Sequence, residues 1–545
     1  MSASPISRPP SPAAARLAGS AGFAAAALAA GGGVFGWALA RGRLLLYGDA
    51  TAHLMIARRM FDSLTPGLSQ WGSVWLPLPH LLMAPFVAFL PLWRSGAAGS
   101  IVSLAAFALA AAFVHRIAAR AFGAGAARWA ALFFLLNPNL LYLAAVPMTE
   151  TVYLAAFLGA VDQIGRYQET GARRHAVCAG LWALAGSMTR YDGWFCLPFF
   201  ALALWHCERR RAGERRWWRM PAARAFCAVA AIGPVFWFAY NAFYFRDWLA
   251  FLRGPYSARQ IYLNALRHGG FRYPGDHQLA PAVLYYLKCA ALDCGTPLLI
   301  LAALGLAAWF WRSRRSAGFG AAGDRYLPAF LLLLPLPWYI WAMWSGNVPI
   351  FVPMYWPHGY YNLRYGVQVL PAAAVWSGAF VLRLGGRWAR PARHGVAIGL
   401  AALVALSYAA MLRGEGPMTY AEAVHNAPAR LAMEHKLAAA LAPRRRGERV
   451  LMFLGTYPGA LADDGIALRA VIQESNFRIW ERALEQPQQY AAWVVVQQGT
   501  SMDQRVNHAA LARYFQPVAR FTAPQQAPVT VYRRRSGVAA AAARS

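Results

Sequence analysis

Two carboxylates stand where long hydrophobic stretches of the sequence end, and their positions suit acid–base chemistry. Asp49 follows the first such stretch, and His53 comes four residues later. Glu150 lies between two further stretches, directly after Thr149. A carboxylate accepts a proton at neutral pH, so Asp49 is a candidate general base, with His53 and Glu150 orienting it or its substrate. Both carboxylates also fit a structural role, Asp49 as a helix N-cap and Glu150 in the first turn of a helix capped by Thr149.

Arginines near the same hydrophobic stretches can bind an anionic substrate. Arg364, followed by Tyr365, offers the forked and permanently charged donor set that binds phosphate. Arg190 and Asp192 share a tight turn, where a simple salt bridge is the alternative, and Arg58 is a further cation.

Aromatic and histidine side chains complete the candidate binding set. The remaining candidate substrate-binding residues are Trp71, Trp75, His80 and His358. Tryptophans offer flat faces on which a ligand can stack, but they also anchor loops at a membrane interface, and His80 can equally be a buried structural residue.

No metal site is predicted. Asp49 and His53 could share a divalent metal, but two ligands are too few to define a site. The six cysteines are scattered through or beside apolar stretches, a spacing that suits neither a disulfide framework nor a zinc site.

The elements that position these residues must lie in a membrane. The chain has 545 residues, of which 58% are hydrophobic and only 14% charged, too little charge to cover the surface of several soluble domains. Its 22 Trp, 24 Tyr and 30 Phe exclude intrinsic disorder. The net charge of +31 comes almost wholly from arginine, and its placement predicts helix orientation rather than nucleic-acid binding.

The hydrophobic stretches predict an α-helical polytopic protein with about eleven transmembrane helices. The expected spans are 17–40, 98–119, 128–146, 151–165, 176–190, 194–206, 225–245, 281–311, 326–344, 366–382 and 395–412. The short, proline-broken stretch 78–93 is assigned to the membrane surface, because counting it as a span would place most arginine clusters outside the cell, against the positive-inside rule.

This topology divides the chain into four parts. They are a cytoplasmic tail (1–16), a transmembrane domain (17–412) with a first external loop (41–97), a small extracytoplasmic α/β domain (413–535) and a low-complexity tail (536–545). Short β-branched runs at 449–454, 492–497 and 529–533, with helix-like stretches at 427–442 and 505–515, predict the α/β domain. Asp49, Glu150 and the C-terminal domain are all expected outside the cytoplasm.

The combination resembles the integral membrane glycosyltransferases of the C-type fold, which include protein O-mannosyltransferases, aminoarabinose transferases and oligosaccharyltransferase catalytic subunits. The resemblance covers roughly residues 15–412 and rests on Gly48-Asp-Ala-Thr-Ala-His53, Trp75-Leu-Pro-Leu-Pro79, Glu150 and Thr189-Arg-Tyr-Asp192. It implies that Asp49 is the acidic residue of the first loop and Glu150 that of the second. The sequence has single carboxylates where an acidic pair occurs in some members, which argues against an oligosaccharyltransferase.

The resemblance implies a bacterial inner-membrane enzyme that moves a sugar from an undecaprenyl- or dolichyl-phosphate donor to the hydroxyl of a lipid, glycan or protein, with inversion at the anomeric carbon. We expect membrane lipid as a partner and no nucleic acid. A transporter or flippase for lipid-linked glycans is the alternative, and it should carry charged residues in the middle of its helices. A structural membrane subunit with a partner-binding domain is a third interpretation.

Overall fold

The computed structural model describes most of the chain. The described residues are 12–212, 216, 219–254, 257–267, 269–315, 324–383, 390–455, 457–463, 465–524 and 526–537. Most of the tail expected at 1–16, and of the one expected at 536–545, lies outside the described residues; helix α1 begins at Pro12.

The chain divides into two compact units. The first contains residues 1–38, 101–145 and 149–422, and the second contains residues 39–100, 146–148 and 423–545. The first external loop therefore belongs to the same unit as the C-terminal segment, a grouping that the sequence did not predict.

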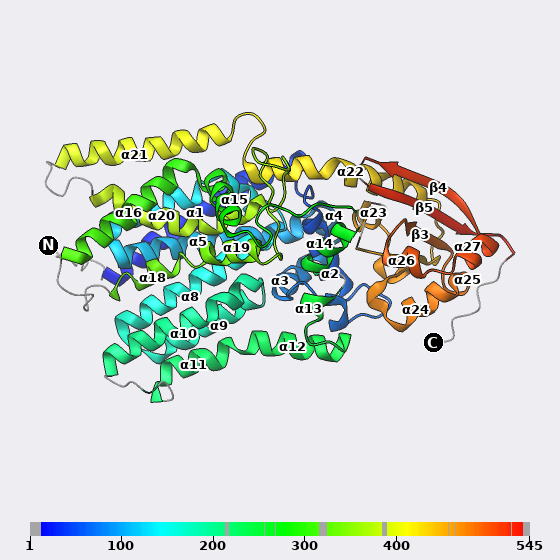
Figure 1. Cartoon of the computed structure of the whole chain (residues 1–545), viewed down its shortest axis with the longest axis horizontal. Coiled ribbons are helices and arrows are strands. Elements are labelled where there is room, and N and C mark those ends of the chain that lie inside the picture. Colours follow the sequence, from blue (N-terminus) through cyan, green and yellow to red (C-terminus); the bar gives the residue numbers. More distant parts are fainter. Residues whose placement is uncertain are drawn as a thin grey trace, which may run out of the picture. The chain divides into compact units, whose positions relative to one another are not determined.

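The first unit is helical. Its elements are α1 (Pro12–Ala40), most of α5 (Ala97–Phe122), α6 (Ala124–Leu135), α7 (Pro138–Ala145), α8 (Glu150–Thr170), α9 (Arg173–Ser187), α10 (Tyr191–Ala212), α11 (Pro221–Ala230), α12 (Ile232–Phe245), α13 (Ala250–Arg253), α14 (Ala258–Arg267), α15 (Leu279–Cys294), α16 (Thr296–Arg315), α18 (Leu327–Leu331), α19 (Pro335–Trp344), the 3-10 helix η3 (Leu363–Val369), α20 (Leu370–Arg383) and α21 (Arg390–Met411). Helices α8, α9, α10 and α11 pack side by side (Figure 1).

The chain is a multi-pass membrane protein. Among the described residues, seven helical segments are long and apolar enough to cross a bilayer, and an eighth span exists if α7 and α8, which meet at a bend of 109°, count as one. The stretch 78–93 forms α3 (Leu78–Val87) and α4 (Leu90–Ser95), neither of which is among these segments.

Several of the eleven expected spans correspond to shorter helices. Helix α6 has 12 residues and α9 has 15. At a rise of 1.5 Å per residue these helices are about 18 and 22 Å long, less than the roughly 30 Å of a hydrocarbon core. The expected span 281–311 is divided into α15 and α16 at Gly295, whose φ of 89° is unfavourable for other residues.

The second unit combines helices with one mixed sheet. Its elements are α2 (Gly48–Arg59), η1 (Leu68–Trp71), α3, α4, most of α22 (Met418–Leu441), β1 (Val450–Met452), α23 (Gly459–Asp463), η4 (Leu468–Ala470), β2 (Val471–Ile472), η5 (Glu474–Asn476), α24 (Arg478–Glu485), α25 (Pro487–Tyr490), β3 (Trp493–Gln497), α26 (Ser501–Arg505), α27 (His508–Tyr514), β4 (Phe515–Ala523) and β5 (Gln526–Arg534).

The sheet has the strand order β2-β1-β3-β5-β4. Strand β1 is parallel to β2 and β3, and β5 is antiparallel to β3 and β4. The three β-branched runs in the sequence correspond to β1, β3 and β5, which confirms the expected small C-terminal α/β fold. Strand β2 is only two residues long, and β4 is exposed at alternate positions, so neither gave a clear hydrophobic run.

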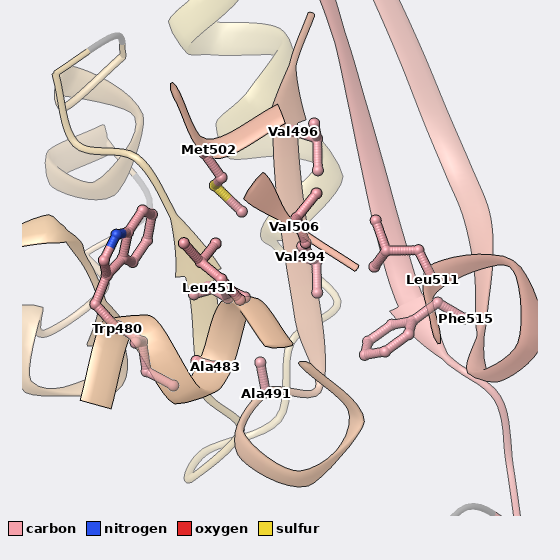
Figure 2. Close-up of a cluster of buried hydrophobic side chains, with 12 residues drawn as sticks. Leu451, Trp480, Ala483, Ala491, Val494, Val496, Met502, Val506, Leu511 and Phe515 are labelled. Carbon is pink, nitrogen blue, oxygen red and sulfur yellow. The ribbon is translucent and has the colours of Figure 1, made fainter. Parts of the chain in front are cut away.

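The core of the second unit lies between this sheet and its helices. Figure 2 shows Leu451 of β1 near Trp480 of α24. In the same cluster Leu511 of α27 lies beside Phe515, the first residue of β4. Trp480 is 5% exposed and Val494 of β3 is fully buried, so this cluster removes a large apolar area from water and stabilises the sheet.

Polar contacts attach the first loop to the C-terminal segment. Gln70 accepts a hydrogen bond from Gln473 Nε2 at 2.8 Å and donates to the carbonyl of Ser475 at 3.0 Å. Arg430 of α22 donates to the carbonyl of Leu45 at 2.7 Å. These buried contacts explain why the loop and the C-terminal segment form one unit.

Candidate functional site

The candidate residues fall into two groups, one in each unit. In the first unit, Glu150, Arg190, Asp192 and Arg364 lie in one buried network, which also contains Tyr339 and Glu422; we call these six residues the Glu150 cluster. In the second unit, Asp49 and His53 lie on helix α2, and His53 contacts Trp75 and His80.

Different elements position the members of the Glu150 cluster. Glu150 is the first residue of α8, directly after the bend that follows α7. Arg190 lies in the turn between α9 and α10, and Asp192 is in the first turn of α10. Tyr339 belongs to α19 and Arg364 to η3. Helix ends and turns thus bring together side chains that are far apart in the sequence.

Arg364 is held by two carboxylates. Its Nε donates to Glu150 Oε1 at 3.1 Å, and its Nη1 donates to Glu422 Oε1 at 3.0 Å. Glu422 also accepts from the backbone N–H groups of Asn362 and Arg364, at 2.8 and 3.1 Å. The Arg364 side chain is only 9% exposed, and its charge is already paired.

Arg190 makes longer contacts and is more exposed. Its Nη1 lies 3.3 Å from Glu150 Oε1, and its Nε lies 3.3 Å from Asp192 Oδ2. Its Nη2 donates to the Tyr339 hydroxyl at 3.0 Å, and this hydroxyl donates to Asp192. The guanidinium carbon is 4.7 Å from the ring centroid of Tyr365, which Arg364 also approaches, at 5.1 Å. Tyr365 is therefore a shared cation–π platform.

Carboxylates outnumber arginines in the Glu150 cluster. Three carboxylates, Glu150, Asp192 and Glu422, face the two guanidinium groups of Arg190 and Arg364. Glu150 Oε1 accepts from both arginines, while its Oε2 is buried with no hydrogen-bond partner among the described residues. An unsatisfied buried carboxylate oxygen is costly and marks a place where a donor from a substrate or water can bind.

Asp49 lies in the first turn of α2 and is not its N-cap. The capping position belongs to Tyr47, which makes no side-chain capping bond. The capping explanation for Asp49 is therefore wrong. The aspartate is half-buried, and His53 follows it one helical turn later, so both side chains share one face of the helix.

His53 is paired with a neutral histidine. Its Nδ1 lies 2.9 Å from Nε2 of His80, and its ring centroid lies 4.4 Å from that of Trp75. Burial, helped by the nearby His53 and Arg59, holds the pKa of His80 well below its ordinary value. His80 is thus uncharged at neutral pH, and its hydrogen bond with His53 fixes the orientation of the His53 ring.

Three candidates lie apart from these groups. Arg58 is buried, ion-paired with Asp62 at 3.0 Å and packed over Trp93 at 4.4 Å. Trp71 is also buried, and its Nε1 lies 3.1 Å from the sulfur of Met60. His358 is exposed in the loop before η3, with Nδ1 3.0 Å from the carbonyl oxygen of Pro353. The contacts of Arg58 and Trp71 are those of packing residues.

Sequence reasoning missed Glu422 and Tyr339. Glu422 follows the last hydrophobic stretch in an ordinary alanine-rich helix, and Tyr339 lies in an aromatic-rich apolar run. Neither has a local signal that separates it from a surface glutamate or a membrane tyrosine. Within the described part of the chain, no three His, Cys, Asp or Glu side chains gather in a way that could hold a metal ion.

Comparisons with known proteins bear on the fold. No family model matches the chain, and no curated protein matches its sequence. Among solved structures, ArnT from Cupriavidus metallidurans bound to undecaprenyl phosphate has a TM-score of 0.54 at 17% identity, with 95% of this chain and 98% of that chain covered. The apo state of the same protein has a TM-score of 0.52 at 16% identity, covering 88% and 93%.

An oligosaccharyltransferase from Archaeoglobus fulgidus, tethered with an acceptor peptide, is also similar, with a TM-score of 0.44 at 12% identity over 89% of this chain and 70% of that chain. The likeness to ArnT extends over almost the full length of both chains. The chain therefore has the C-type fold of the integral membrane glycosyltransferases, as the resemblance in its sequence predicted.

Proposed function

We propose that the protein transfers a sugar from a polyprenyl-phosphate donor to an acceptor hydroxyl on the extracytoplasmic side of the inner membrane of a bacterium. The observation that carries the proposal is the full-length fold likeness to a structure that holds undecaprenyl phosphate. The arrangement of Asp49, His53 and His80 supports it, because a carboxylate next to an oriented histidine suits general base catalysis.

In this mechanism the acceptor oxygen attacks the anomeric carbon while the bond from that carbon to the phosphate oxygen breaks. The acceptor proton passes to Asp49, and the lipid phosphate leaves with the bonding electrons. A single displacement inverts the anomeric configuration. The His53–His80 pair holds the face of α2 that carries Asp49, and the half-buried Trp75 beside His53 offers an aromatic face to the sugar.

Arg190 is the better candidate than Arg364 for the donor phosphate. Both of its carboxylate contacts are 3.3 Å long, whereas those of Arg364 are 3.0 and 3.1 Å, and it is the more exposed of the two. Replacing a carboxylate partner of Arg190 with a phosphate should therefore cost less free energy than the same exchange at Arg364. We assign Arg364 to positioning Glu150, which it holds from Nε. Arg58, buried against Asp62, is not part of this scheme.

A transporter or flippase remains the alternative, and one observation favours it. Asp162 is fully buried in α8 and is bound by Arg116 and Arg120 of α5, so charges do occur inside the helices. Asp162 and these two arginines are ion-paired with one another, as in a packed structural cluster, which agrees better with an enzyme than with an open path for a charged group.

Incubating the full-length protein in membranes with a panel of radiolabelled polyprenyl-phosphate pentoses and hexoses tests the proposal. An enzyme releases the lipid phosphate and moves the label to an acceptor. A flippase moves the labelled lipid across the bilayer intact, and that result would contradict the proposal. Mass analysis of surface glycans from cells with and without the protein then identifies the acceptor.

A further inference from the structure

A second polar site lies in the first unit, at the far end of α8 from Glu150. It is a cavity of about 420 Å³, within the size range of small-ligand pockets. Its walls come from the ends of α5, α8 and α10 and from the segment that leads into α18. Gly165 of α8 lies 15 residues after Glu150, about 22 Å along the helix, so this cavity is separate from the Glu150 cluster.

Arginine dominates the wall of this cavity. Four arginines and two carboxylates line it, namely Arg120, Arg210, Arg211, Arg325, Glu169 and Asp324. Arg120 lies 3.4 Å from Glu169, and Arg210 lies 3.2 Å from Asp324. The described residues of this wall include no third carboxylate, and the hydrogen bonds of Arg211 and Arg325 there go to neutral oxygens, those of the Gln168 carbonyl and the Tyr326 hydroxyl.

Arg120 is held rigidly and still has a donor to offer. Its Nη2 donates to Asp162, which also binds Arg116 and lies 3.6 Å from Arg166. The side chain is only 8% exposed, and its Nη1 has no hydrogen-bond partner among the described residues. A buried guanidinium nitrogen without an acceptor is unfavourable, so an acceptor supplied by a ligand would be bound strongly.

Gly165 keeps the space beside this nitrogen open. A Cβ atom at this position would lie 3.1 Å from Arg120 Nη1 and 3.2 Å from Pro328. Any larger residue would therefore fill the cavity wall next to the unpaired donor. The absence of a side chain leaves room for a ligand oxygen.

The distribution of arginine predicts that this end of the helices faces the cytoplasm. Arg166, Arg173, Arg174 and the run Arg209–Arg211 all lie near it, and the positive-inside rule assigns such clusters to the inner face. Basic pockets between transmembrane helices on this side of a membrane bind the head groups of anionic lipids.

We propose that this cavity binds a phosphate group, either the phosphodiester of an anionic lipid head group or free phosphate. Arg211 and Arg325, which are hydrogen-bonded to neutral oxygens within the described part of the chain, supply positive charge, and Arg120 supplies an oriented donor at Gly165. A phosphate oxygen accepts several charge-assisted hydrogen bonds at once, which matches a wall of convergent guanidinium groups. Phosphate binding at this cavity does not depend on the proposed sugar transfer.

Native mass spectrometry of the full-length protein, released from detergent, tests the proposal. Phosphatidylglycerol and zwitterionic phosphatidylcholine are added separately, each with and without inorganic phosphate. We expect retained phosphatidylglycerol or retained phosphate, and little phosphatidylcholine. Displacement of the lipid by millimolar phosphate identifies free phosphate as the ligand, and its persistence identifies the lipid; both results support the site.

Two variants locate the binding. The double variant R211Q/R325Q should weaken retention about tenfold or more, because two charge-assisted hydrogen bonds are lost. G165V keeps every charge and should also weaken binding, by occupying the wall. R174Q, which removes an exposed arginine at the start of α9 outside the cavity, serves as the matched control. Equal retention by wild type, R211Q/R325Q and G165V, or no retention of either ligand by the wild type, overturns the proposal.

Discussion

Arg364 donates from Nε to Glu150 Oε1 at 3.1 Å, although 214 residues separate the two in the sequence. This contact ties the first residue of α8 to η3, and Glu422 holds the other side of the same guanidinium group. A buried ion pair of this kind stabilises little by itself, but removing one partner leaves an uncompensated charge and is strongly destabilising.

A double-mutant cycle measures this coupling. R364Q should destabilise the protein by about 3 kcal/mol or more, because it leaves the buried Glu150 and Glu422 without the guanidinium group that lies between them. E150Q should cost less, because Arg364 keeps Glu422 and Arg190 keeps Asp192. The double variant should cost less than the sum of the two, with a coupling of about 0.5–3 kcal/mol. Unfolding of the protein in detergent, followed by tryptophan fluorescence, gives these free energies. Additive effects would show that the two side chains do not interact.

Arg190 and Arg364 should differ in what their loss affects. R190Q should weaken the binding of undecaprenyl phosphate about tenfold or more while changing stability less than R364Q does, because Arg190 is more exposed and its ion pairs are longer. Titration of the lipid phosphate into purified variants, beside their thermal unfolding midpoints, separates the two effects. An R190Q variant that binds the lipid as tightly as the wild type would remove Arg190 from the phosphate site.

His80 should make the stability of the second unit depend on pH. Burial lowers the pKa of His80 in the folded protein, so between that pKa and about 6.5 the unfolded chain binds a proton that the folded chain does not. The contribution of neutral His80 to the free energy of unfolding should therefore be fully present above about pH 7 and should fall as the pH drops below about 6.5. Burial raises the pKa of Glu434 and of Glu474, so the protonation of these two glutamates should stabilise the folded protein as the pH falls, opposite to the effect of His80.

The variant H80Q isolates the histidine from these glutamates. Its unfolding midpoint, measured from pH 7.5 to pH 5.5, should fall less than that of the wild type. H358Q, which changes an exposed histidine, should retain the wild-type slope. An H80Q variant with the wild-type slope would show that His80 does not titrate in this way.

Topology can be tested by cysteine labelling from one side of the membrane. The more accessible native cysteines, Cys178 and Cys227, are first changed to serine. In that background an impermeant maleimide applied outside the cell should label D49C and H358C but not R174C. Labelling of R174C alone would show that the chain has the opposite orientation, with the candidate base Asp49 in the cytoplasm.

The sequence predicted the fold class because hydrophobic length and arginine placement are local signals that a bilayer imposes on the chain. It predicted the strands β1, β3 and β5 for a similar reason, since each is a short β-branched run. It did not predict that residues 39–100 and 423–545 form one unit, because contacts such as Gln70 with Gln473 join polar residues that have no recognisable pattern.

The candidate site could be predicted in part. Glu150, Arg190, Asp192 and Arg364 were chosen separately from the sequence, and the structure brings them into one network. The role of each arginine could not be predicted, because it depends on how many carboxylates surround it. Glu422, which pairs with Arg364, lies in an alanine-rich helix and has no local signal of its own.

The central claim is that Asp49 accepts the acceptor proton during sugar transfer, and D49N tests it most directly. Loss of a general base should slow transfer by about 100-fold or more. Transfer of label from the polyprenyl-phosphate sugar is measured for the wild type, for D49N and for D247N, which makes the same change at an aspartate paired with Arg253. The account predicts that D247N is as active as the wild type and that D49N is nearly inactive although it still binds undecaprenyl phosphate. A D49N variant with wild-type activity would contradict it.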